Sequence, residues 1–235
     1  MSKVHRDAEE WMDRANVALR SKISLSELES LVTSGEKMPL GLTTPLEKLK
    51  NRFDQACAWI ASLKEEVPCP MESTNCSGSD LDAGNKAEWL LNMRNALNSD
   101  DDNVVSNLLD LSSQGSRLPV DIDILHLLQT AIDARNWSQK AKRWIPSAGE
   151  NYKRGKFDDL EDHLESSTTI MKRAQQLTDG KADWKLDLSD DLENIVTSAE
   201  EWFEKVCLYP ILHVIFVLLF LILLFSLAPT ASYRG

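Results

Sequence analysis

The stretch Leu31-Val32-Thr33-Ser34-Gly35-Glu36-Lys37-Met38-Pro39-Leu40 decides the fold, because it recurs as Leu111-Ser112-Ser113-Gln114-Gly115-Ser116-Arg117-Leu118-Pro119-Val120. Each copy has a leucine, a glycine four residues later and a proline four residues after the glycine. We expect each glycine to form the left-handed cap at the end of a helix, and each proline to stop that helix. The recurrence predicts repeated helical units.

Tryptophan-containing segments repeat on either side of these stretches. Ala8-Glu9-Glu10-Trp11 recurs as Ala87-Glu88-Trp89 and, more loosely, as Ala141-Lys142-Arg143-Trp144. A second set, Leu49, Phe53, Ala56 and Trp59, corresponds to Leu127, Ala131, Ala134 and Trp137, and again to Leu192, Val196, Ala199 and Trp202. Because tryptophans at helical spacing usually pack in a core, we interpret them as core residues.

The repeats predict three helical units at residues 1–66, 86–140 and 141–205, with a flexible loop at 67–85. Glycine and proline are sparse, at 9 and 8 residues, and no sustained period-two alternation indicates a sheet. A single unit of this size cannot bury its apolar face, so neighbouring units should stack or share long helices. The predicted fold is therefore all-α, an elongated bundle of spectrin-like helical units.

Two predicted helix starts carry specific capping residues. Ser24 and Glu27 have the spacing of a capping box, in which the serine hydroxyl accepts from the third backbone amide. Thr44-Pro45-Leu46-Glu47 places a hydroxyl, a first-turn proline and a glutamate in the same pattern. An apolar stripe at helical spacing follows: Leu46, Leu49, Phe53, Ala56 and Ile60.

The charge balance argues against nucleic acid as a partner. The chain has 37 acidic and 26 basic side chains and a net charge of −11, which repels a phosphate backbone. One group of basic residues lies close together in sequence: Lys140, Lys142, Arg143, Lys153, Arg154 and Lys156. We interpret this group as a solvated helix face that balances nearby acids.

Few residues suggest chemistry, so we predict no catalytic, cofactor-binding or metal-binding residue. His5-Arg6-Asp7 fits the H-x-D part of an iron site, but it lies at the chain start without a distant second histidine. We expect His126 at the edge of the core and His163 in solvent. Aspartate runs at 100–102 and 190–191 are typical of helix caps or solvated faces.

The cysteines give no evidence of a metal or redox site. Cys57, Cys69, Cys76 and Cys207 lack the paired C-x-x-C spacing of zinc ribbons and thioredoxin-type sites. Cys57 falls on the apolar stripe, where it acts as a small hydrophobe. Cys69 and Cys76 could bridge a short loop, but we expect a reducing compartment.

The C-terminal end differs from the rest of the chain. Only Pro210, His213 and Ser226 interrupt the apolar run from Val206 to Leu227. As a helix this run would measure about 33 Å, so we predict a transmembrane helix at 206–228, a short tail at 229–235 and membrane lipid as a partner. The acidic part would then be cytosolic. A second origin stays open, in which the run is translated intron and the protein is nuclear.

The repeated segments resemble a known family. They are similar to the PLU-type helical domain of the jumonji, ARID-domain histone lysine demethylases, the lysine-specific demethylase 5 family. The similar stretches are Ala8 to Trp11, Lys22 to Leu31, Gly35 to Leu40, Leu46 to Trp59 and Gly115 to Trp137. The resemblance covers most of residues 4–205, and we expect the nearest relatives in plants. In that family the helical domain follows the catalytic core and a zinc finger, and it is a scaffold between chromatin-reading modules.

The resemblance implies a non-catalytic scaffold that binds protein partners. The iron-binding jumonji domain has no counterpart in this sequence, so the family's catalytic residues match no position, and the chain corresponds to an isolated fragment. Two alternatives stay open. One is a tail-anchored adapter at the endoplasmic reticulum or nuclear envelope, unrelated to chromatin, and the other is an enzyme whose site has no recognisable motif.

Overall fold

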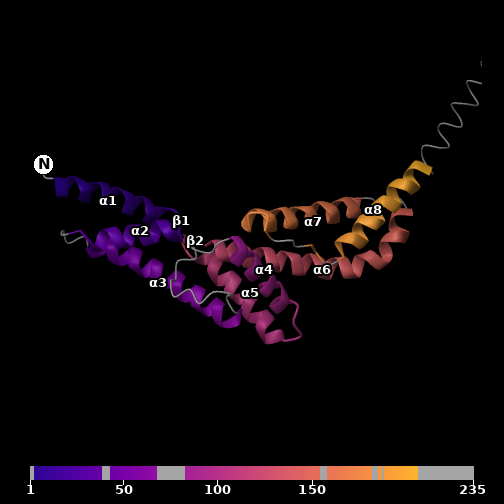
Figure 1. Cartoon of the computed structure of the whole chain (residues 1–235), viewed down its shortest axis with the longest axis horizontal. Helices are drawn as coiled ribbons and strands as arrows, with labels where there is room; N and C mark the ends of the chain where they lie inside the picture. The colour runs from indigo at the N-terminus through magenta and orange to yellow at the C-terminus, as the bar shows by residue number, and fades with distance from the viewer. Residues whose placement is uncertain are drawn as a thin grey trace, which may run out of the picture. The chain divides into compact units, whose positions relative to one another are not determined.

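The computed structural model describes residues 3–38, 43–67, 83–153, 158–181, 185–186 and 188–205. Its helices are α1 (Lys3–Arg20), α2 (Leu25–Glu36), α3 (Thr43–Glu66), α4 (Ala83–Leu97), α5 (Asp102–Arg117), α6 (Asp123–Lys153), α7 (Asp158–Leu177) and α8 (Ser189–Phe203). Two short strands, β1 (Ile23–Ser24) and β2 (Val120–Asp121), pair in parallel (Figure 1). The helices agree with the predicted all-α architecture, whereas the strand pair has no counterpart in the prediction.

The described residues divide into two compact units. The first contains residues up to 139 together with 166–186, and the second contains 140–165 and the described residues from 188 onward. Helices α6 and α7 therefore each contribute residues to both units. The three units predicted at 1–66, 86–140 and 141–205 stay a prediction.

Helices α1, α2 and α3 pack together within the first unit. Each buries one side at helical spacing, as in α1, where Ala8, Trp11, Ala15 and Ala18 are buried. The start of α2 is fixed by the predicted capping box, because the Glu27 amide donates to the Ser24 hydroxyl at 3.3 Å. The described part of the chain thus confirms this helix start.

The repeated glycines are not left-handed caps, which corrects the prediction. Gly35 and Gly115 lie inside α2 and α5, are buried, and do not have positive φ. A Cβ atom built on Gly35 would lie 2.6 Å from Cζ2 of Trp11, and one on Gly115 would lie 2.8 Å from Cζ2 of Trp59. The glycines are therefore required because an indole ring approaches the helix backbone closely.

The same contact thus occurs twice. The Trp11 indole donates to the Leu31 carbonyl at 3.0 Å, and the Trp59 indole donates to the Leu111 carbonyl at 2.8 Å. Both carbonyls lie one turn before the glycine that faces the ring. In both copies, the amide three residues after the glycine donates to its carbonyl, at 3.2 Å for Gly35 and 3.1 Å for Gly115. We call each arrangement a Trp–Gly contact.

Helix α3 takes part in both Trp–Gly contacts. Its Leu46 lies against the position of Gly35, with Cδ1 only 2.9 Å from the built Cβ, and its Trp59 lies over Gly115. In the second contact the place of Leu46 is taken by Leu125 of α6, at 2.8 Å from the built Cβ. The set α1, α2 and α3 is thus repeated by α3, α5 and α6, with α3 shared.

Most of the tryptophans whose side chains are described lie in the core, as predicted. Trp11, Trp59, Trp89 and Trp137 are each no more than 5% exposed. Trp144, in the second unit, is half-buried and stacks at a tilt on His163, with ring centroids 4.8 Å apart. The side chains of the remaining two tryptophans lie outside the described residues.

The predicted fold class ended in a transmembrane helix, and this part needs correction. Among the described residues, no helix combines the length and the apolar character that a membrane crossing requires. The last described helix, α8, is amphipathic, because Leu192 and Ala199 are buried while Glu193 and Glu200 are exposed. The predicted span at 206–228 itself lies outside the described residues. The described residues support an all-α fold class, with no transmembrane helix among them.

Candidate interaction site at the strand pair

The strand pair forms where four helix ends meet. Strand β1 links α1 to α2, and β2 links α5 to α6, with Ile23 opposite Val120 and Ser24 opposite Asp121. Val120 and Ile122 are buried at 1% exposure, whereas Asp121 between them is exposed, because successive strand residues face opposite sides. This alternation holds β2 on the core and places Asp121 at the surface.

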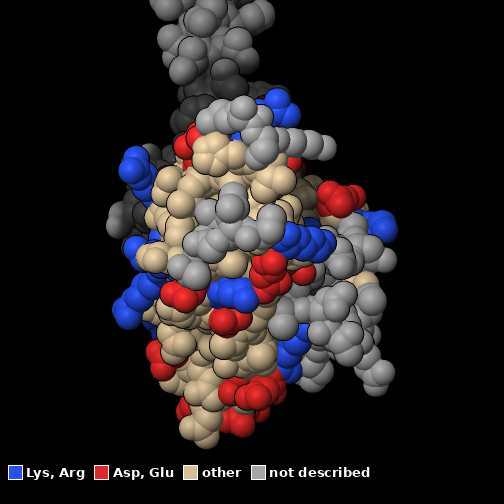
Figure 2. All heavy atoms as spheres, turned by 90° about the vertical axis from the view of Figure 1, so that its left-hand side faces the viewer, with Lys and Arg blue, Asp and Glu red and all other residues tan. Residues whose placement is uncertain are grey.

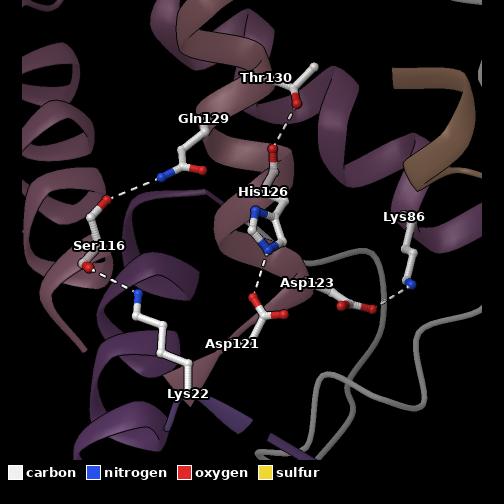
Figure 3. Close-up of polar contacts among 8 residues, drawn as sticks. All are labelled: Lys22, Lys86, Ser116, Asp121, Asp123, His126, Gln129 and Thr130. Atoms are coloured by element: carbon white, nitrogen blue, oxygen red, sulfur yellow. Dashed lines mark hydrogen bonds and ion pairs between the residues drawn. The ribbon is translucent and has the colours of Figure 1, made fainter. Parts of the chain in front are cut away.

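Polar side chains surround the strand pair (Figure 3). The Lys22 ammonium donates to the Ser116 carbonyl at 3.2 Å, which satisfies an unpaired carbonyl in the last turn of α5. The Ser116 hydroxyl donates to the Ser112 carbonyl at 2.8 Å and accepts from the Gln129 amide at 3.1 Å. These bonds join the end of α1, the end of α5 and the second turn of α6.

Two further pairs lie on the other side of β2. His126 Nε2 lies 2.7 Å from Asp121 Oδ1, and the Lys86 ammonium lies 2.9 Å from Asp123 Oδ2, which connects α4 to the start of α6 (Figure 3). The Thr130 hydroxyl donates to the His126 carbonyl at 2.8 Å. Asp121 and Asp123 have side chains that are 56% exposed, so these pairs contribute little stability individually.

This geometry suits holding segments together rather than catalysis. His126 and Asp121 have the hydrogen bond of a catalytic pair, but the nearby Ser116 hydroxyl bonds to Ser112 and Gln129. Within the ranges that the structure describes, no three His, Cys, Asp or Glu side chains are grouped to hold a metal ion. The arrangement can act as a non-covalent crosslink or as part of a binding surface.

The histidines show mixed agreement with their predicted places. His126 is half-buried at the edge of the core, as expected. His5 lies on the exposed side of α1, 3.4 Å from Glu9 one turn later. His163 was expected in solvent, but it is half-buried against Trp144. That prediction is wrong because the local acidic sequence did not reveal the facing aromatic ring on α6.

The other predicted polar features lie at the surface or outside the described residues. Lys140, Lys142 and Arg143 are exposed, whereas the side chains of residues 153–156 are not described. Asp101 caps α5 by accepting from the Asn103 amide at 3.0 Å, as expected for the aspartate run. Cys57 is half-buried on α3, and the three remaining cysteines are outside the description.

The surface charge shows no separation into large basic and acidic regions on the face in Figure 2, where Lys and Arg side chains are interspersed with Asp and Glu. Lys50 and Glu36 form an exposed ion pair at 2.6 Å. A mixed surface of this kind gives no extended positive region for a phosphate backbone.

Sequence reasoning placed His126 and missed the other residues of this site, among them Lys22, Ser116 and Gln129. Lys22 is separated from Ser116 by 94 positions, so no local pattern could reveal their contact. Ser116 does lie in the repeated stretch, directly after Gly115, which was the only available signal. The two-residue strands are too short for a period-two pattern to identify.

The fold and the site define a class of protein, a helical domain with repeated Trp–Gly contacts. The family model described as PLU-1-like protein matches residues 3–208. The chain belongs to this family, which confirms the PLU-type domain indicated by the sequence. The matched region is a helical domain, distinct from the catalytic jumonji domain of the related demethylases. No curated protein and no solved structure matches the chain.

Proposed function

We propose that this chain is a non-catalytic helical scaffold that binds protein partners, as a PLU-type domain related to the lysine-specific demethylase 5 family. The observation that carries the proposal is the family match over residues 3–208. The repeated Trp–Gly contacts support it, because they hold long helices in fixed positions and so present preorganised surfaces.

The chemistry of the described side chains also fits a scaffold. The Lys22–Ser116 bond joins the segment after α1 to the end of α5, and the His126–Asp121 pair joins β2 to the first turn of α6. The buried polar groups are mostly satisfied within helices, as with Thr130 and Thr178, which donate to carbonyls one turn earlier. These two hydroxyls are therefore engaged within their helices and do not face a substrate.

Protein partners are the proposed ligands, and nucleic acid is not. Apolar side chains that protrude from the described surface include Val17 at 64% exposure, Leu91 at 46% and Leu109 at 40%. Leu91 and Leu109 lie on α4 and α5, which pack against each other. Such side chains are useful probes of a protein interface, because burial of a leucine is worth about 1.5–3 kcal/mol.

The test combines an activity assay with a binding assay. The purified full chain should neither bind Fe²⁺ with 2-oxoglutarate nor demethylate histone peptides. Affinity capture followed by crosslinking mass spectrometry should recover a reproducible partner that crosslinks to one surface of the chain. Leu91→Glu or Leu109→Glu should reduce recovery at least tenfold if that surface includes α4 and α5, with Val17→Glu as the matched control. Turnover of a histone peptide would contradict the proposal.

A further inference from the structure

Two groups of helices are joined through α3. We define the first bundle as α1, α2 and the N-terminal half of α3, and the second bundle as the C-terminal half of α3 with α4, α5 and the start of α6. Leu46 of α3 belongs to the first Trp–Gly contact and Trp59 to the second. These residues are 13 positions apart, or about 20 Å along the helix axis. A single helix therefore connects the two cores.

The strand pair makes a second connection between the same bundles. Ile23 and Ser24 belong to the first bundle, and they pair with Val120 and Asp121 of the second. Lys22 adds its bond to the Ser116 carbonyl across the same boundary. We call the two residue pairs of the β1–β2 ladder, together with the Lys22–Ser116 bond, the strand latch.

The strand latch differs from the rest of the fold in burial. Trp11 and Trp59, which hold the bundles, are 2% and 5% exposed. In the latch, by contrast, Lys22, Ser116 and Asp121 are exposed, Val120 is its one buried residue at 1% exposure, and the ladder is two residues long on each side. Segments with few buried contacts open at a lower free energy than the whole domain. The latch can therefore open while both bundles stay folded.

We propose that the strand latch fixes the angle between the two bundles by resisting bending of α3. A long helix bends gently unless other contacts restrain it, and the latch supplies a restraint across the boundary that α3 crosses. With the latch closed, the angle between the bundles is fixed, and so is the distance between their surfaces. With it open, the bundles flex about the middle of α3, near Arg52. The inference rests on the proposed scaffold function and adds a way to regulate its geometry.

The test measures a distance across the boundary in the full chain. Spin labels on unnatural amino acids at Val17 of α1 and Leu91 of α4, both exposed, report the relation between the bundles. Electron–electron double resonance should give one narrow distance distribution for the unsubstituted chain. Lys22→Met, which removes the Lys22–Ser116 bond, and separately Ile23→Pro should at least double its width, while thermal unfolding stays a single transition.

The control is Lys50→Met, which removes an exposed ion pair inside the first bundle and should leave the distribution narrow. Lys22→Met serves on its own if Ile23→Pro fails to fold, because it removes an exposed side-chain bond across the boundary. Unchanged widths in the latch variants, or a broad distribution before any substitution, would overturn the proposal. If the distance distribution broadens in the latch variants but no protein partner is recovered, the latch proposal is supported and the scaffold function is rejected.

Discussion

At the scale of single residues, a glycine and a tryptophan determine each interhelical contact. The sequence revealed both glycines through their recurrence, and it revealed the helical spacing of the tryptophans. It did not reveal that the two residue types touch, because Trp11 and Gly35 are on different helices. A glycine near a helix end is ordinarily a cap, and the close approach of a ring has the same local sequence.

Replacing either glycine with alanine should destabilise the fold by overpacking. The new Cβ would lie 2.6 Å from Trp11 in Gly35→Ala and 2.8 Å from Trp59 in Gly115→Ala, so the ring or helix must move. We expect losses of about 1–3 kcal/mol in the free energy of unfolding, measured by urea denaturation. Ser113→Ala, at an exposed position of α5, is the matched control. Stability equal to that control would show that the rings do not occupy these positions.

The pKa of Lys50 gives a pH dependence at the same scale. The hydrogen bond and negative charge of Glu36 raise this pKa above its ordinary value. Because the folded pKa is the higher one, the pair's contribution to stability is fully present below about pH 10.4 and is lost as pH rises through the folded pKa. We expect Lys50→Met to be slightly less stable than the unsubstituted chain at pH 8, and the difference to shrink as pH rises through the folded pKa of Lys50. A difference that grows with pH would contradict this.

At the scale of elements, the end of α1 depends on a side chain from α3. Arg52 is half-buried and donates to the Ala18 carbonyl at 2.9 Å and the Leu19 carbonyl at 2.7 Å. A guanidinium suits this place because it satisfies two unpaired carbonyls and carries positive charge at a helix C-terminus. Its position in the sequence, 33 residues from Leu19, gave no indication of the contact.

Replacing Arg52 with methionine should weaken the packing of α1 on α3. Two carbonyls would lose their charged donor, so we expect a loss of about 1.5–3 kcal/mol in unfolding free energy. Amide hydrogen exchange should also accelerate in the last turn of α1 more than in α5. Lys48→Met, at an exposed position of α3, is the control. Equal exchange in the last turn for both variants would rule out the capping role.

Elements with strong local signals were predictable, and elements formed by distant contacts were not. The capping box at Ser24 fixed the start of α2, because its residues are neighbours in sequence. The pairing of β1 with β2 joins positions 97 residues apart in a ladder too short to leave a pattern. The candidate site at the strand pair was therefore missed, apart from the placing of His126 at the edge of the core.

At the scale of the whole molecule, the repeats in sequence correspond to a shared helix in the first unit. The sequence matched Trp11 with Trp89 and Trp59 with Trp137, whereas the structure gives Trp11 and Trp59 the same role. This difference arises because the third helix of one set is the first helix of the next. Composition predicted the all-α class. Hydropathy alone supplied the predicted membrane span, and no helix among the described residues has the length and apolar character of one.

Because α3 takes part in both Trp–Gly contacts, we expect the two contacts to depend on each other. Native-state hydrogen exchange of Gly115→Ala tests it most directly, because the substitution lies in the second bundle and the readout can be taken in the first. We predict that the protection of backbone amides against exchange falls in α1 and α2 as well as in α5. Protection lost from α5 alone, with α1 and α2 unchanged, would contradict the claim.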